Sequence, residues 1–209
     1  MANISKIRGF QPVKHVNGSP YNGQSNIYYV PASDGTALFV GDPVKLAADA
    51  NAQGIQHVTK ATAGAAVLGV VVGVINTKLD PVGGTMSGGS IALDTPVYRP
   101  ASTGQYVLVC DSPDVVYEVE AVTGSNASYS FAVADVGLNA DLSTVAGSTV
   151  TGTSAAALNM ATAAAGATLQ WKILGVVQRP DNEITGANTK VLVKINNAQL
   201  SAGTGTAGV

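Results

Sequence analysis

The chain has 209 residues, of which 46% are hydrophobic and 11% are charged, with eleven Lys and Arg against thirteen Asp and Glu. The net charge of −2 and the lack of a basic cluster argue against binding along a nucleic-acid backbone, which needs several cations on one face. Two histidines and one cysteine leave few ionisable groups from which to build a catalytic pocket. The composition favours an architectural role over an enzymatic one.

No stretch of the sequence has the pattern of a signal peptide or of a membrane helix. The first fifteen residues carry charge and proline where a signal peptide needs an unbroken apolar run. Ala65–Ile75, the most apolar window, is about half of the ~20 residues that a membrane helix requires, and it contains Gly69 and Gly73. We therefore expect the protein to stay in the cell that makes it and to have no membrane partner.

The whole chain predicts an all-β fold, a mainly antiparallel barrel or sandwich, because β-branched and aromatic residues occur in short runs between Gly, Pro, Asn, Asp and Ser. Residues 17–200 are expected to form a single β domain. The tail 201–209 consists mostly of Gly, Ala, Ser and Thr and is predicted to be flexible.

The N-terminal segment, residues 1–16, is the strongest candidate for an interaction element. Ile4, Ile7 and Phe10 are apolar in a stretch that is otherwise polar and too short to have its own core. The segment is therefore either an arm that docks on another surface, such as a neighbouring subunit, or the first strand of the same domain. The first alternative predicts that deleting residues 1–10 weakens association with a partner and leaves the fold intact.

Two runs further along, Ile27–Val30 and Thr36–Val40, flank the turn sequence Pro31-Ala-Ser-Asp-Gly35 and predict a hairpin. A sharp corner is then expected at Gly41-Asp42-Pro43, since proline cannot donate to a ladder and restricts the residue before it.

The stretch Val67–Ile75 predicts a strand that is buried on both faces. At period two, one face is aliphatic throughout and the other includes Gly69 and Gly73, where another sheet or a bulky ring could approach closely. Ile173–Val177 repeats part of this pattern, so the two segments are predicted to be equivalent central strands.

Three further strands are expected at Tyr106–Cys110, Val115–Val122 and Tyr129–Val133, and a last one at Thr189–Ile195. Val115–Val122 alternates, which predicts a half-buried strand whose acids face solvent. Between these strands lies the Ala-, Thr- and Gly-rich region 134–168. Within it, Ala155–Ala165 is predicted to form either a short helix capped by Ser154 or a packed loop.

Few residues are candidates for chemistry. Glu118 and Glu120 have the spacing of a same-face carboxylate pair, but the simpler reading is a solvated face. His15 and His57 have no adjacent acid to orient them, and Cys110 ends an apolar run as expected for a buried, inert thiol. Asp111 and Asp114 would supply too few oxygens for a calcium ion and fit turn positions better. We predict no catalytic residue, no cofactor-binding residue and no metal ligand.

Several phrases of the sequence, taken together, resemble a family of tailed-bacteriophage virion proteins. They share glycine and turn residues and cover most of residues 10–200: Asn17–Gly23, Pro31–Val44, Leu68–Val74, Val109–Asp114 with Tyr117–Val119, Val136–Ala140, Leu174–Val177, Pro180–Asn182 and Val193–Asn196. These phrases are signatures of a fold and carry no catalytic fingerprint.

The resemblance implies a capsid decoration or cement protein, on the outside of the phage head, that clamps neighbouring major capsid subunits. Its implied partners are the major capsid protein and further copies of itself in a symmetric oligomer, with a trimer favoured and a dimer possible. An N-terminal arm would add a strand or an apolar anchor to a partner. The chain lacks the length and the long spine helix of a shell-forming major capsid protein, so the resemblance points to an accessory role.

The competing function is a carbohydrate- or surface-binding β module of a phage tail or an adhesin. Such a module would show exposed aromatic residues grouped on loops, and Tyr21, Tyr28 and Tyr29 are the only tyrosines close together in the sequence. A hydrolase that uses Glu118 and Glu120 is a more distant alternative.

Overall fold

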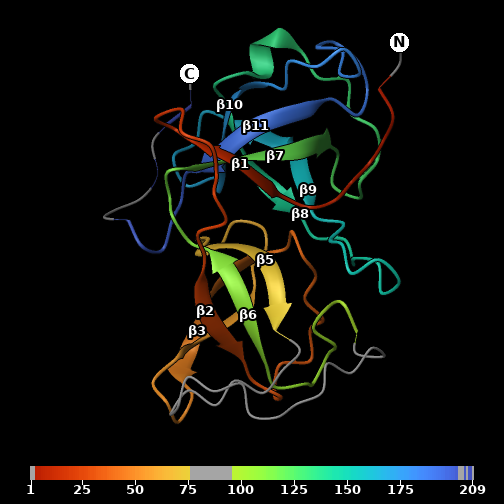
Figure 1. Ribbon diagram of the computed structural model, residues 1–209. Helices are drawn as coiled ribbons and strands as arrows, with labels where there is room; N and C mark the ends of the chain where they lie inside the picture. The colour runs from red at the N-terminus through yellow and green to blue at the C-terminus, as the bar shows by residue number, and fades with distance from the viewer. Residues whose placement is uncertain (1–2, 76–95, 202–204, 206, 209) are drawn as a thin grey trace.

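The strands of the protein form two groups, one above the other in Figure 1. The computed structural model describes residues 3–75, 96–201, 205, 207 and 208. Within these residues the chain is all-β, as the sequence predicts, with a closed five-stranded barrel and a six-stranded sheet. Its only helical element there is the short 3-10 turn η1 (Val133–Asp135).

The lower group in Figure 1 is the closed barrel, with strand order β2-β4-β3-β5-β6. Its strands are β2 (Asn26–Val30), β3 (Pro43–Ala50), β4 (Gln56–Lys60), β5 (Gly69–Ile75) and β6 (Gln105–Cys110). The barrel closes because β2 pairs antiparallel with β6 on one side and parallel with β4, at Tyr29 and His57, on the other. Alternate aliphatic side chains of these strands fill its interior.

The upper group is the six-stranded sheet, in the order β1-β7-β11-β10-β8-β9. Its strands are β1 (Gln11–His15), β7 (Val115–Val122), β8 (Asn139–Ser143), β9 (Ala157–Ala164), β10 (Trp171–Val176) and β11 (Lys190–Ile195). A parallel pairing of Ala121 in β7 with Leu158 in β9 closes the circuit of strands through β7. Trp171 lies fully buried inside and contacts the rings of Phe10 and Tyr117.

The chain path ties the two groups together, because β1 belongs to the upper sheet, β2 to β6 build the barrel, and β7 to β11 return to the upper sheet. The buried side chain of Gln170 donates to the carbonyls of Thr62 and Ala65 below and accepts from the Leu142 amide above. Val67 adds two backbone hydrogen bonds, to Asn197 and Gln199. These contacts join the barrel to the upper sheet.

The predicted hairpin of Ile27–Val30 with Thr36–Val40 is wrong. β2 pairs with β4 and β6, whereas Thr36–Val40 makes only isolated bridges, Leu38 with Arg99 and Val40 with Thr153. The cause is the buried Arg99, whose guanidinium donates to the carbonyls of the turn between the two runs. The acceptors are Pro31, Thr36 and Asp34, with Thr103 as a fourth. The turn therefore surrounds a cation and does not close a ladder.

The prediction of a helix or a packed loop at Ala155–Ala165 is also wrong, since Ala157–Ala164 is strand β9. Ser154 caps no helix; its hydroxyl donates to the buried Asp42 carboxylate and accepts from the Ala156 amide. The small alanines permit close packing against the neighbouring strands, so strand pairing overrides helix propensity here.

Two central-strand predictions agree with the structure. β5 lies between β3 and β6, and β10 lies between β11 and β8. Residues 67–71 are buried on both faces, while the rest of β5 is partly exposed. A side chain at Gly69 would collide with the carbonyl of Cys110, so what approaches this glycine is the β6 backbone, and neither a second sheet nor a ring.

The predicted corner is present: the Asp42 amide donates to the Phe39 carbonyl, and Gly41 has φ of +95°. The expected strands at β6, β7 and β11 also agree. Tyr129–Val133 is not a strand, because only an isolated bridge from Ser130 to Ala187 forms before η1. Most of the predicted flexible tail lies outside the described residues; of the residues described there, Ala207 accepts from Lys172 and Gly208 donates to Ala165.

Candidate functional site

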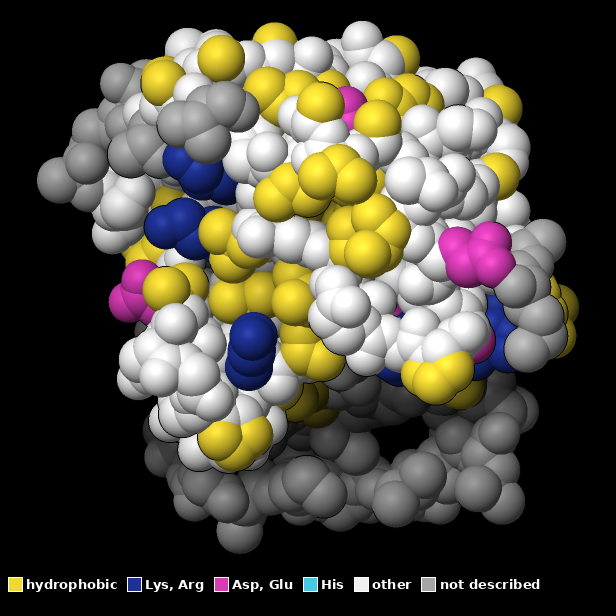
Figure 2. All heavy atoms as spheres, turned by 90° about the horizontal axis from the view of Figure 1, so that it is seen from above, with side chains coloured by type: hydrophobic (Ala, Val, Ile, Leu, Met, Phe, Trp, Pro, Cys, Tyr) yellow, Lys and Arg dark blue, Asp and Glu magenta, His cyan; other side chains and the backbone are white. Residues whose placement is uncertain are grey.

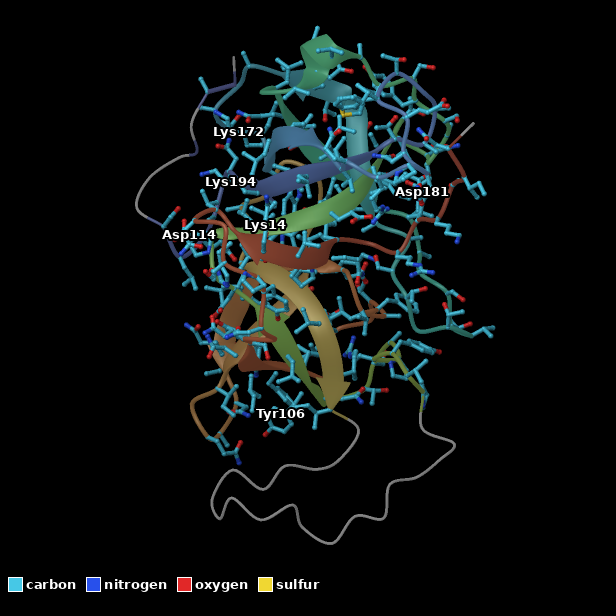
Figure 3. All side chains as sticks on the ribbon, turned by 45° about the horizontal axis from the view of Figure 1, so that its top comes forward. Lys14, Tyr106, Asp114, Lys172, Asp181 and Lys194 are labelled. Carbon is cyan, nitrogen blue, oxygen red and sulfur yellow. The ribbon has the colours of Figure 1, made fainter. Side chains whose placement is uncertain are left out.

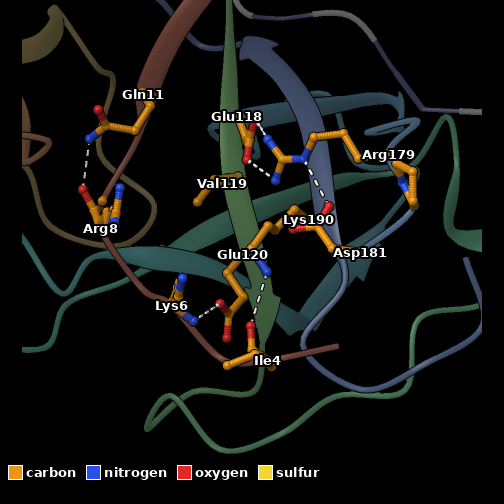
Figure 4. Close-up of a pocket in the computed structure, with 12 residues that line it drawn as sticks. Ile4, Lys6, Arg8, Gln11, Glu118, Val119, Glu120, Arg179, Asp181 and Lys190 are labelled. Carbon is orange, nitrogen blue, oxygen red and sulfur yellow. Dashed lines mark hydrogen bonds and ion pairs between the residues drawn. The ribbon is translucent and has the colours of Figure 1, made fainter. Parts of the chain in front are cut away.

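A pocket of about 470 Å³ lies between the N-terminal segment and the outer face of β7 and β11 (Figure 4). We call residues 3–9 the strap and this cavity the strap pocket. The residues that line the strap pocket are Ile4, Lys6, Arg8, Gly9, Gln11, Glu118, Val119, Glu120, Arg179, Pro180, Asp181 and Lys190.

In the structure, residues 3–15 of the N-terminal segment lie against their own chain. Gln11–His15 is the first strand, paired with β7. Phe10 is fully buried against Trp171, so it is a core residue of its own chain and no anchor for a partner, whereas Ile4 is 70% exposed. A deletion of residues 1–10 would therefore remove part of the core, which corrects the expectation that the fold is left intact.

Polar contacts hold the strap on the surface of the chain. The Asn3 side chain donates to the Glu183 carbonyl and to Thr189, and its oxygen accepts from the Glu183 amide. The hydroxyl of Ser5 and the amide of Lys6 each donate to the carboxylate of Glu120, both at 2.7 Å. Hydrogen bonds attach the strap to the rest of the chain, and the buried Phe10 follows directly after it.

The two acids of β7 do not form the solvated face that alternation predicted. Glu120 is only 4% exposed, because the strap crosses over it. Glu118 accepts two hydrogen bonds from the Arg179 guanidinium, at 2.8 and 3.0 Å, and this pairing raises the pKa of Arg179. The two carboxylates share a face, but every carboxylate oxygen already accepts from the chain. This arrangement suits holding the strap and the Arg179 loop better than transferring a proton.

Three of the four cations of the strap pocket, Lys6, Arg8 and Lys190, have fewer partners than Arg179, which binds Glu118 and Asp181. Lys190 on β11 is 8% exposed, and its Nζ donates to the Ile4 carbonyl at 3.0 Å. Among the described residues, no acid forms an ion pair with Lys6, Arg8 or Lys190. The lining carries four Lys and Arg against three Asp and Glu, a formal charge of +1 in a chain of net −2.

The strap carries a sequence signal for this site. Ile4, Lys6 and Arg8 line the pocket and the intervening Ser5 and Ile7 do not, as expected for alternate residues of an extended chain. Arg179 and Asp181 could not be placed beside Glu118 from sequence, because the contact spans about sixty residues.

The other sequence candidates lie apart from the strap pocket. The ring of His15 lies 6.5 Å from that of Tyr21 between centroids, and that of His57 lies 5.5 Å from that of Tyr29. Tyr28 is buried in the barrel and donates to Asp111 at 2.7 Å, so Tyr21, Tyr28 and Tyr29 do not form an exposed aromatic cluster.

The remaining candidates from the sequence are Asp111, Asp114 and Cys110. The Asp111 carboxylate is occupied by donors from Asn26 and Tyr28, while Asp114 is exposed. In the described ranges no three His, Cys, Asp or Glu side chains gather as metal ligands would. The Cys110 thiol is buried and accepts from the Tyr117 hydroxyl at 3.4 Å, and burial raises its pKa.

Comparison with known proteins identifies no relative: no family model, no curated protein and no solved structure matches the chain. Across the described residues there is also no helix of the length and hydropathy that would cross a membrane.

Proposed function

We propose that this chain is a non-enzymatic virion structural protein that binds the outside of a phage capsid and cements neighbouring major capsid subunits. The observation that carries the proposal is the set of turn and glycine phrases, spread over residues 10–200, that resembles tailed-phage virion proteins. In this function the partners are the major capsid protein and other copies of the chain, with a trimer favoured over a dimer.

Four glycines of these phrases occupy positions that this fold requires. Gly23, Gly41 and Gly137 each belong to one of the phrases and adopt φ between +88° and +95°, where residues with a side chain are strained. Gly69, in a fourth phrase, has no room for a side chain against the β6 backbone. The phrases therefore mark positions on which this fold depends, and they are more than a reflection of glycine-rich composition.

The surface of the upper group supports a role in protein association. Figure 2 shows apolar side chains spread across this end of the molecule, with few charges among them. Val133, Leu174 and Ile184 of the upper group are 66%, 41% and 41% exposed. Exposed apolar side chains such as these are available for contact with another protein.

Electron microscopy of purified virions tests the proposal. The expected result is density for this fold on the outer shell, at symmetry-related positions that bridge major capsid subunits. Density confined to the tail, or no copy in the virion, would overturn the proposal, and tail density would favour the surface-binding module. The dispersed positions of the three tyrosines argue against that module.

A further inference from the structure

We propose that the strap pocket binds an extended acidic segment of a partner protein, in which an apolar residue and two carboxylates alternate with other residues. In the setting of the proposed function this partner is the capsid subunit, and to that extent the inference rests on the function proposed above. The binding chemistry itself depends only on the residues of the pocket.

The donors of the strap pocket have fewer partners than its acceptors. Glu118 and Glu120 accept from Arg179 and from the strap, and the exposed Asp181 accepts from Arg179, so each acid of the pocket has a donor in the chain. Lys190 has three N–H donors and one recorded acceptor, the Ile4 carbonyl. Among the described residues Lys6 and Arg8 lack an ion pair. The capacity that remains is cationic, and a carboxylate complements it.

The pocket-lining side chains of the strap alternate along the chain. Ile4, Lys6 and Arg8 lie on the pocket side of an extended segment, at every second residue. An extended ligand beside the strap repeats at the same spacing, so its alternate side chains would meet Ile4, Lys6 and Arg8 in turn. Ile4, which is 70% exposed, offers an apolar contact next to the two cations.

The lining of the strap pocket fits a peptide better than a nucleic acid or inorganic phosphate. A nucleic-acid backbone needs cations spaced along a surface, whereas these are gathered at one cavity of about 470 Å³ together with Ile4. A cavity of this size holds a few side chains and is too confined for a duplex. Inorganic phosphate would use the cations and leave Ile4 without a role. The pattern therefore favours an acidic peptide.

The direct test is an NMR titration of the full chain with acetyl-Leu-Ser-Glu-Ser-Glu-amide and with the reversed order, acetyl-Glu-Ser-Glu-Ser-Leu-amide. The expected result is saturable shifts at the amides of Gly9, Val119 and Lys190 with at least one peptide, and none with the versions that carry Gln for Glu. Shifts with inorganic phosphate or single-stranded DNA that equal those with the peptide, or no shifts at millimolar peptide, would overturn the proposal.

Matched variants locate the binding. Lys6→Gln and Arg8→Gln remove exposed cations of the strap, and each is expected to weaken peptide binding about tenfold, as for the loss of one charge-assisted hydrogen bond. Lys14→Gln and Lys194→Gln remove the same charge elsewhere, since Lys194 lies four residues along β11 from Lys190 and Figure 3 places both lysines toward the other end of the upper sheet from Asp181 of the pocket. Equal losses in both pairs would show a general charge effect and reject the site. Lys190→Gln is informative only if its thermal unfolding matches that of the wild type, and the strap variants carry the test if it does not.

A capsid co-sedimentation assay separates this inference from the proposed function. If the wild type binds capsids prepared without it and the strap variants bind equally, the pocket proposal fails and the cement function stands. If the wild type binds no capsid but the peptide titration succeeds, the cement function fails and the acidic-peptide site stands. Strap variants that lose both interactions, with Lys14→Gln unaffected, support both.

Discussion

The ring of Phe10 stacks on the indole of Trp171, with centroids 4.1 Å apart and an interplanar angle of 21°. Both side chains are fully buried, and Tyr117 meets the same indole edge-on at 5.6 Å. A residue from the beginning of the chain thus completes the core of a sheet whose other core strands follow residue 115. The strap pocket depends on this contact, because Phe10 fixes the end of the strap.

Phe10→Ala is expected to lower the free energy of unfolding by about 3–5 kcal/mol, the usual cost of removing a buried aromatic ring. Ile4→Ala in the same segment is the control and should change it by less than about 0.5 kcal/mol, since Ile4 is 70% exposed. Urea unfolding followed by circular dichroism measures both. A stable Phe10→Ala protein would mean that the stack contributes little.

Deletion of residues 1–8 is expected to give a folded protein without the strap, because Phe10 and strand β1 remain. Deletion of residues 1–10 also removes Phe10 and should show the additional destabilisation of Phe10→Ala. Urea midpoints and the amide spectrum of the two truncated chains distinguish these outcomes. Equal stability of both would show that residues 9 and 10 are dispensable for the fold.

Arg99→Met is expected to destabilise the protein by about 2–4 kcal/mol, since four partly buried carbonyl interactions lose the buried guanidinium that donates to them. Arg99→Lys keeps the charge but cannot reproduce the planar fork, so it should recover only part of the loss. Amide exchange should accelerate first in the turn 31–36. Arg179→Lys is the control, as the Arg179 side chain is 41% exposed and its pairing lies at the surface.

Alkaline pH should weaken the fold through the buried Tyr28 and Tyr117 and the half-buried Tyr21. Desolvation by burial raises the pKa of Tyr21 to about 12 and also raises those of Tyr28 and Tyr117, whose hydroxyls bind Asp111 and Cys110. A raised pKa in the folded state favours the protonated form, so this stability is complete below about pH 10, the ordinary tyrosine value, and is lost as pH rises beyond it. Urea midpoints from pH 8 to 12 measure the decline. Tyr117→Phe should reduce the slope, and a flat profile would contradict the assignment.

The sequence predicted the all-β class and the bounds of β7 because alternation and β-branched runs are local signals. It failed where one distant residue decides the local structure. Arg99 converts the predicted hairpin turn into a cage of carbonyls, and Asp42 binds Ser154, which was expected to cap a helix. The strap pocket was missed for the same reason, since its walls come from residues 4–11, 118–120, 179–181 and 190. The alternation of Ile4, Lys6 and Arg8 along the strap was the only local sequence signal of the pocket.

Cys110 is the only cysteine of the chain. Its thiol is 1% exposed, and burial, the largest influence, raises its pKa, so little thiolate is available at neutral pH. A thiol reagent such as DTNB should therefore react slowly with the native protein at pH 8, at a rate set by opening of the structure, and fast in urea. Phe10→Ala should accelerate the native reaction, because Cys110 and Phe10 belong to one core cluster. Rapid labelling of the native wild type would show that this core opens readily to solvent and would contradict the burial of Cys110 beside Tyr117.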